Sequence, residues 1–166
     1  MKVAPTILLG LAASLAAASA DAAGCSQERA IYTDESGTYS LTFEAVDPDS
    51  SAASHRFKIA IKGSDALLDG YVMPSEPVDR TNGMLFYNCP EGDATGDEIA
   101  ACTVWEGVIY ASLSGKIALL PQQGEEAAQQ LLLPGFGPAL RHSRAWEQGK
   151  ASVVPWDVMQ FKGCSQ

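Results

Sequence analysis

Histidine and positive charge are both scarce in this chain of 166 residues. Eleven lysines and arginines stand against twenty aspartates and glutamates, which gives a formal net charge of −9. An acidic surface repels phosphate backbones and anionic lipid headgroups, so we expect neither nucleic-acid binding nor electrostatic membrane binding. The two histidines, His55 and His142, stand in no metal-binding pattern such as H-E-x-x-H. We expect both to be surface or capping residues, and we predict no metal site.

The sequence also lacks the short motifs that identify common catalytic and cofactor sites. It contains no G-x-S-x-G, no G-x-G-x-x-G and no phosphate-binding P-loop pattern. Cysteines are few, and none has the C-x-x-C spacing of thiol redox sites and zinc knuckles. We therefore assign no catalytic residue and no cofactor.

What the chain does have, at its beginning, is the pattern of an export signal. Lys2 supplies a positive charge, Ile7 to Ala18 form a short apolar run, and Ala18-Ser19-Ala20 is a small-x-small cleavage pattern. We predict that residues 1–20 are removed, which leaves residues 21–166 as a single domain in the periplasm or outside the cell. Loss of Lys2 leaves ten basic against twenty acidic residues, a net charge of −10.

This leader has two alternative interpretations besides cleavage. A membrane anchor needs roughly 20 apolar residues, and Asp21 interrupts the run soon after its end, so we predict no integral membrane span. Lipidation of Cys25 is the other alternative, because small residues precede it. Ala22 stands where a bulky aliphatic residue is expected, which makes this the minor alternative.

Four cysteines in an exported domain predict two disulfides, for which the sequence permits three pairings. Cys89 and Cys102 flank the polar stretch 90–101, which we interpret as a loop between two strands. Cys25 and Cys164 stand at the two mature ends, which often lie close together in compact domains. We predict the nested pairs Cys25–Cys164 and Cys89–Cys102.

Strand-like alternation covers most of the chain. Residues 55–62 place Phe57, Ile59 and Ile61 on one face and polar or small side chains on the other. Similar patterns predict strands at 39–44, 67–73, 84–89, 102–112, 116–120 and 153–161. We expect the strand over 102–112 to be central, since it is apolar on both faces, with a bend near Gly107 and Pro155 at the start or edge of the last strand.

Helical signals are confined to the later part of the chain. Residues 125–133 begin with two acids and end at Pro134-Gly135, which predicts a helix. Pro138 is suited to the first turn of a second short helix through Arg144. The fold class predicted is therefore mainly β, an antiparallel meander forming a sandwich or curved half-barrel, with one or two short helices near the C-terminus.

An acidic stretch, residues 91–98, has the carboxylates that calcium prefers but not the spacing of an EF-hand loop. We interpret it as a solvated hairpin loop, and Asp47 and Asp49 as turn formers.

Residues 131–146 combine proline and glycine with six large apolar side chains. One expectation is that this segment closes the core over an open face of the sheet. The other is that part of it forms a partner surface, with Phe136 and Trp146 as anchors and Arg141 at the rim.

Together these observations favour a non-catalytic binding or interaction module of the bacterial envelope. Its partner would be an envelope protein or a small ligand, and its oligomeric state is not specified by the sequence. The alternative is a small periplasmic enzyme whose residues converge only in the fold.

Overall fold

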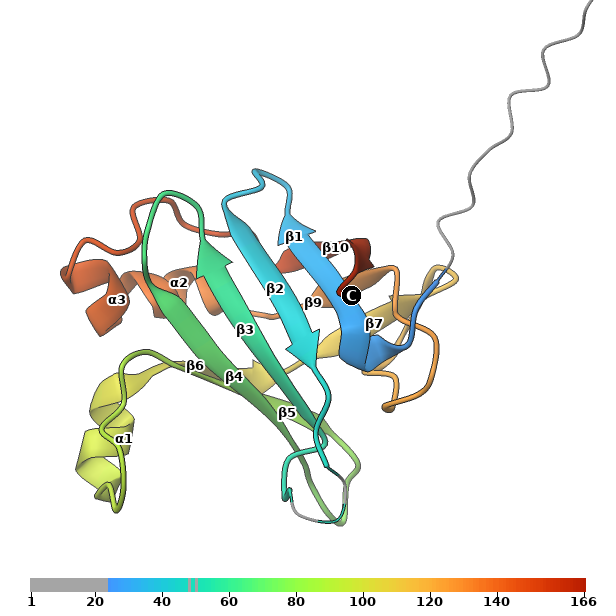
Figure 1. Cartoon of the computed structure of the whole chain (residues 1–166), viewed down its shortest axis with the longest axis horizontal. Coiled ribbons are helices and arrows are strands. Elements are labelled where there is room, and N and C mark those ends of the chain that lie inside the picture. The colour runs from blue at the N-terminus through green and yellow to red at the C-terminus, as the bar shows by residue number, and fades with distance from the viewer. Residues whose placement is uncertain (1–23, 48, 50) are drawn as a thin grey trace, which may run out of the picture.

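The computed structural model describes residues 24–47, 49 and 51–166. The predicted leader, residues 1–20, lies outside these residues. Within them, ten strands form one antiparallel sheet that curls into a half-barrel, accompanied by short helices (Figure 1). The mainly β prediction is confirmed, in its half-barrel form.

The first six strands form the predicted meander, because each pairs antiparallel with the strand before it. The buried faces alternate as expected, and Phe43 of one strand lies opposite Phe57 of the next. The first strand was not predicted. The strands are β1 (Ala30–Asp34), β2 (Tyr39–Glu44), β3 (His55–Ile61), β4 (Leu67–Pro74), β5 (Thr81–Phe86) and β6 (Thr103–Val108).

The predicted strand over 102–112 is two strands, β6 and β7 (Tyr110–Leu113), separated by Ile109. The sheet order is β6-β5-β4-β3-β2-β1-β10-β9-β7-β8, so one residue carries the chain from one end of the sheet almost to the other. Such a bend is how a curled sheet turns a corner. The expectation of a central strand is wrong for β6, which lies at one end. Its second apolar face is covered instead by the segment after β9, since the Trp105 indole donates to the Pro134 carbonyl at 3.0 Å.

Three later strands complete the sheet: β8 (Lys116–Leu119), β9 (Gln130–Leu132) and β10 (Val158–Cys164). The last strand begins five residues later than predicted, and it pairs with both β1 and β9. This pairing brings the two ends of the domain together, with Ala30 opposite Cys164.

Both predicted disulfides are present and pair all four cysteines. Cys25 and Cys164 have Cα atoms 6.1 Å apart, and Cys89 and Cys102 have Cα atoms 5.2 Å apart. The first joins the ends of the domain, beside the short 3₁₀ helix η1 (Gln27–Arg29). The second joins the end of α1 to the segment that follows β5.

The helix predicted over 125–133 is wrong. Its main chain pairs with distant segments instead: Ala127 N–H with the Cys25 carbonyl at 2.8 Å and Gln129 N–H with the Ser112 carbonyl at 3.1 Å. Residues 130–132 form β9, and Leu131 is buried. Pairing with other strands outweighs the helix propensity of this short stretch, which is a weak preference on its own.

The stretch 90–101 is not only a loop, because it contains the helix α1 (Gly96–Cys102). Thr95 caps this helix: its hydroxyl accepts from the Glu98 N–H, and the Glu98 carboxylate accepts from the Thr95 N–H. This reciprocal pair is a capping box, whose T-x-x-E pattern is readable in the sequence.

Two further helices, α2 (Phe136–Arg141) and α3 (Arg144–Glu147), occupy the region where the helix through Arg144 was predicted. In Figure 1 α2 lies behind the strands β3 and β4, and α3 lies to their left. Phe136 of α2 is fully buried, and its ring contacts Tyr39 and Trp105 edge-on. This helix therefore closes the core on the concave side of the half-barrel. No helix in the described ranges has the length and apolar character needed to cross a membrane.

Candidate functional site

The predicted partner surface around Phe136 does not form as expected. Phe136 has 0% of its surface exposed, so it belongs to the core and cannot anchor a partner. Trp146 is partly buried against that core, and the Arg141 guanidinium lies 6.0 Å from the centre of its ring. For Phe136, the expectation that this segment closes the core is the correct one.

The most exposed large apolar side chains of this part of the molecule lie instead in residues 152–157, which we call the apolar loop. Trp156 exposes 68% of its surface, Val153 45% and Val154 43%. The strand predicted over 153–161 would begin in this loop. In the structure residues 153–157 precede β10 and pair with no strand.

The apolar loop is held in place on both sides by named contacts. The Tyr39 hydroxyl donates to the Val153 carbonyl, and burial raises the pKa of Tyr39 to about 12, so the donor stays protonated. At the other end, the Asp157 carboxylate accepts a hydrogen bond from the Gly135 N–H at 2.9 Å. The main-chain carbonyl of Asp157 accepts one from the Leu133 N–H at 2.8 Å. The loop backbone is thus fixed while its apolar side chains face solvent.

Close packing against α2 requires a glycine. A Cβ atom at Gly137 would come within 2.5 Å of the Pro155 carbonyl oxygen and 2.8 Å of a Val154 methyl. Pro155 is buried at this contact. The loop therefore presses its main chain onto the start of α2, which leaves the neighbouring Trp156 exposed.

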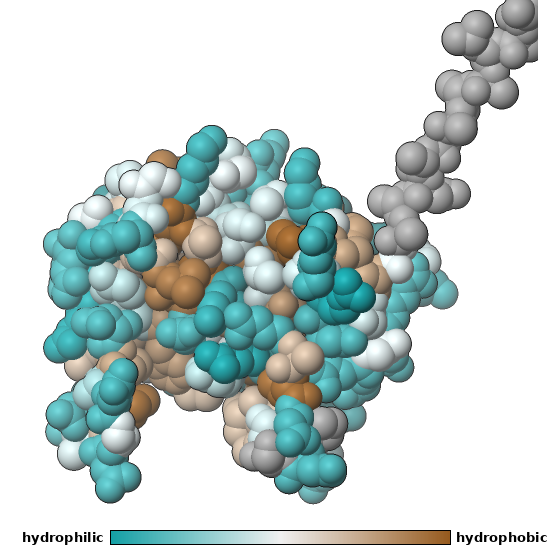
Figure 2. All heavy atoms as spheres, viewed as in Figure 1, coloured by the Kyte–Doolittle hydropathy of each residue, from teal (hydrophilic) through white to brown (hydrophobic). Residues whose placement is uncertain are grey.

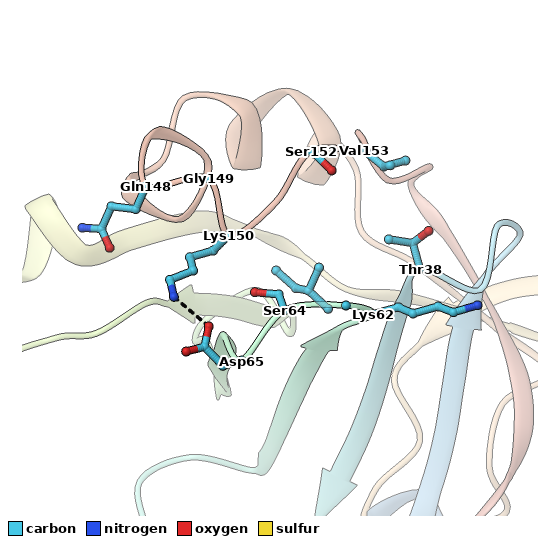
Figure 3. Close-up of a pocket in the computed structure, with 11 residues that line it drawn as sticks. Thr38, Lys62, Ser64, Asp65, Gln148, Gly149, Lys150, Ser152 and Val153 are labelled. Atoms are coloured by element: carbon cyan, nitrogen blue, oxygen red, sulfur yellow. Dashed lines mark hydrogen bonds and ion pairs between the residues drawn. The ribbon is translucent and has the colours of Figure 1, made fainter.

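A cleft of about 600 Å³ adjoins the apolar loop (Figure 3). One wall is the chain after α3, and the other is formed by the turns that flank β2 and β3. A salt bridge of 2.7 Å between Lys150 and Asp65 joins the two walls, whereas Lys62 extends away from this pair. The wall residues include the hydroxyls of Thr38, Ser64 and Ser152.

The electrostatics of this cleft differ from those of the whole chain. Lys150 lowers the pKa of Asp65 through a hydrogen bond and its charge, and Asp65 raises the pKa of Lys150 in the same way. Two lysines and one aspartate give the lining a net charge of +1, in a chain of net charge −9. The cleft is therefore a polar, weakly cationic border to an apolar surface.

The nearest approach to a catalytic pair is at Ser54 and His55. His55 is buried, so the expectation that it lies at the surface is wrong; His142 is exposed and caps α2. The Ser54 hydroxyl lies 3.0 Å from Nδ1 of His55, whose Nε2 lies 2.8 Å from the Pro121 carbonyl. Burial lowers the pKa of His55.

This pair lacks the surroundings of an activated serine. The Ser54 hydroxyl also lies within hydrogen-bond distance of the Val72 carbonyl, at 3.2 Å. The Ser54 N–H donates to that same carbonyl, and the Ala53 N–H donates to the Ser51 hydroxyl. These two main-chain donors are therefore engaged and do not form an oxyanion hole, which needs donors aimed at the reacting oxygen.

The acidic stretch 91–98 runs into α1, and its Glu98 serves the helix cap described above. In the part of the chain that the structure covers, no cluster of three or more histidine, cysteine or acidic side chains is arranged to hold a metal ion.

Fold and surface together define a disulfide-linked antiparallel β domain that carries a fixed, exposed aromatic loop. No protein-family model, no curated protein and no solved structure matches this chain. Its function must therefore be inferred from the geometry of its own residues.

Proposed function

We propose that the chain is an exported, non-catalytic binding module and that its apolar loop engages a protein partner. The observation that carries the proposal is the 68% exposure of Trp156 beside the exposed Val153 and Val154. Contiguous apolar side chains at the surface of a soluble domain mark interaction sites. Tryptophan is also the residue type most enriched among the side chains that dominate binding energy.

The rigidity of the loop supports the same role. Its main chain is fixed by Tyr39, Gly135 and Leu133, so little conformational entropy is lost when a partner binds. The adjoining cleft supplies the polar rim that surrounds the apolar centre of most interfaces, with Lys62, Lys150 and Asp65 at its border.

Export is supported by the crosslinks. Two disulfides are typical of oxidising compartments such as the periplasm or the exterior. The Cys25 sulfur is bonded to Cys164, and a sulfur in a disulfide cannot carry a lipid thioether. This argues for cleavage of the predicted leader and against lipidation of Cys25.

Site-specific photo-crosslinking in the cell envelope tests the proposal. The substitution Trp156→p-benzoylphenylalanine places a photoreactive ring at the centre of the apolar loop. Ile117→p-benzoylphenylalanine is the control, because Ile117 is 61% exposed and lies on β8, outside the loop. We expect a discrete protein adduct from position 156 and not from position 117.

Two results would overturn this proposal. One is an identical adduct pattern from both positions, which would indicate random collisions. The other is a preference of the purified domain for lipid vesicles, detected as a change in Trp156 fluorescence, with no protein adduct.

The enzyme alternative rests on the contact between Ser54 and His55. A fluorophosphonate probe, which labels activated serines, distinguishes the two functions. We expect no labelling at Ser54, because its hydroxyl donates to the Val72 carbonyl and the main-chain N–H groups of Ala53 and Ser54 are already engaged.

A further inference from the structure

A second concave site lies between α1 and the outer face of the sheet. It has a volume of about 410 Å³, within the range of small-molecule sites. Figure 2 shows this face, with brown and tan atoms between α1 and the hydrophilic centre of the sheet. We call it the α1 groove; its lining residues are Asp69, Tyr71, Phe86, Asn88, Cys89 and Ile99.

Two aromatic rings form one part of this lining. Tyr71 of β4 and Phe86 of β5 have ring centres 6.3 Å apart, and their planes are inclined at 54°. Both side chains are only partly buried, so their surfaces remain accessible. Ile99 from α1 adds an apolar wall, which the Cys89–Cys102 disulfide holds at its end.

The polar side of the groove is a carboxylate. Asp69 lies opposite Lys58 on one neighbouring strand and Phe86 on the other. The Lys58 amine, however, lies 3.3 Å from the Glu44 carboxylate on β2. No salt bridge in the described residues includes Asp69.

The charge around the groove is strongly asymmetric. The segment from residue 81 to residue 115, which includes β5, α1 and β6, contains no lysine or arginine. It contains five acidic residues, namely Glu91, Asp93, Asp97, Glu98 and Glu106. None of these five residues lines the groove, so they act on a bound cation only through the longer-range negative potential of this segment.

On the opposite side, β3 supplies Arg56 and Lys58, and Glu44 lies within 3.4 Å of Arg56 as well. The Arg56 guanidinium lies 5.9 Å from the centre of the Tyr71 ring. Tyr71 thus already accepts a cation from the β3 side. Phe86 of β5 belongs to the acidic segment itself, and among the described residues no cation–π contact includes its ring.

We propose that the α1 groove binds a small organic ammonium ion with an apolar or aromatic body. The body would pack against Tyr71, Phe86 and Ile99, and the ammonium would lie near Asp69. Aromatic faces attract cations, and an ionised carboxylate only accepts hydrogen bonds, which an ammonium supplies. The site shares no residue with the apolar loop or its cleft, so its failure would leave the proposed function unaffected.

The experiment is a titration of the exported, disulfide-bonded protein followed by amide NMR shifts. The probe is 2-phenylethylammonium, and 2-phenylethanol is its neutral counterpart of similar shape. We expect shifts centred on residues 69, 71, 86 and 99, with the ammonium bound at least about tenfold more tightly than the alcohol, a difference of about 1.4 kcal/mol.

Variants then separate charge from shape. Asp69→Asn should weaken ammonium binding by about tenfold and leave alcohol binding nearly unchanged, since it removes only the charge. Asp79→Asn is the matched control, because it makes the same change of net charge at an exposed position in the turn between β4 and β5, at the other end of that hairpin from Asp69, and it should have little effect. Tyr71→Leu should weaken ammonium binding by about twofold to fivefold, and it tests the site independently if Asp69→Asn does not fold.

Equal affinity for the ammonium and the alcohol would overturn the proposed charge recognition. Shifts that avoid the groove, or equal weakening by Asp69→Asn and Asp79→Asn, would overturn the site itself.

Discussion

Two neighbouring segments late in the chain, residues 131–146 and the apolar loop, are both rich in large apolar side chains and both contain proline. The first contributes the fully buried Phe136 to the core, whereas the second exposes 68% of Trp156. The difference arises because the first segment packs directly on the sheet, whereas the apolar loop lies one layer further out. The helix α2 packs against the concave face of the sheet, and the apolar loop packs against the start of α2. Apolar composition alone therefore does not distinguish a core segment from a surface that binds.

The comparison predicts that Phe136→Ala lowers the unfolding free energy much more than Trp156→Ala does. A buried aromatic side chain replaced by alanine costs about 3–5 kcal/mol of unfolding free energy. Urea unfolding of purified protein measures this loss, with Trp156→Ala as the exposed comparison. A change below about 0.5 kcal/mol for Phe136→Ala would place it with ordinary surface substitutions and would remove the contrast.

Gly137→Ala tests the contact between the two segments. The added methyl group would meet the Pro155 carbonyl, and we expect a loss of about 1–3 kcal/mol from overpacking. It should also reduce the adduct formed from position 156, because the loop must shift. Gly96→Ala is the control, since a Cβ there meets no atom within 4 Å. Equal stability of the two variants would contradict the close packing of loop and helix.

Tyr39→Phe removes the hydrogen bond that fixes the loop at Val153. We expect a loss of about 1 kcal/mol of unfolding free energy, typical of one buried hydrogen bond. Amide hydrogen exchange of residues 152–157 should become faster, while exchange in β2 changes little. Tyr71→Phe, at a partly exposed position on the outer face, is the comparison. Unchanged exchange in the loop would show that other contacts suffice to hold it.

The smallest expected effect is a pH dependence of the unfolding free energy, which arises at His55 in the core and not in the apolar loop. Burial lowers the pKa of His55 below its usual 6.5, so the unfolded chain binds a proton more readily than the folded one. The stability from neutral His55 is therefore complete above about pH 6.5 and declines as the pH falls below it. We expect unfolding free energy to fall more between pH 7.5 and 5.5 in the natural chain than in His55→Gln. Parallel curves for the two proteins would refute this.

Much of the fold could be predicted because its signals are local. Alternation in β3 and the turn residues around it identify the meander. The pairing of Cys25 with Cys164 is the exception, since it spans 139 residues and was predicted from their positions at the two ends of the domain. The capping box of Thr95 and Glu98 was also readable and was missed.

The candidate site was not predictable in the same way, because its determinants are distant in sequence. Tyr39 and Val153 are 114 residues apart, and nothing in either segment identifies the other as its partner. The valines of the loop resemble the start of a strand, but in the structure this segment packs against Gly137 of α2 instead. The helix predicted over 125–133 is absent for the same reason, since the main chain of residues 129–132 pairs with β7 and β10.

The most direct test of the account measures stability and binding together in Trp156→Ala, using the protein that crosslinks at position 156. We expect the unfolding free energy to change by less than about 0.5 kcal/mol, as for a surface substitution. The affinity for the partner should fall by at least about thirtyfold, the loss that corresponds to removing a dominant interface side chain. Unchanged affinity, or a loss of stability as large as that of Phe136→Ala, would contradict the claim that the apolar loop is the binding surface.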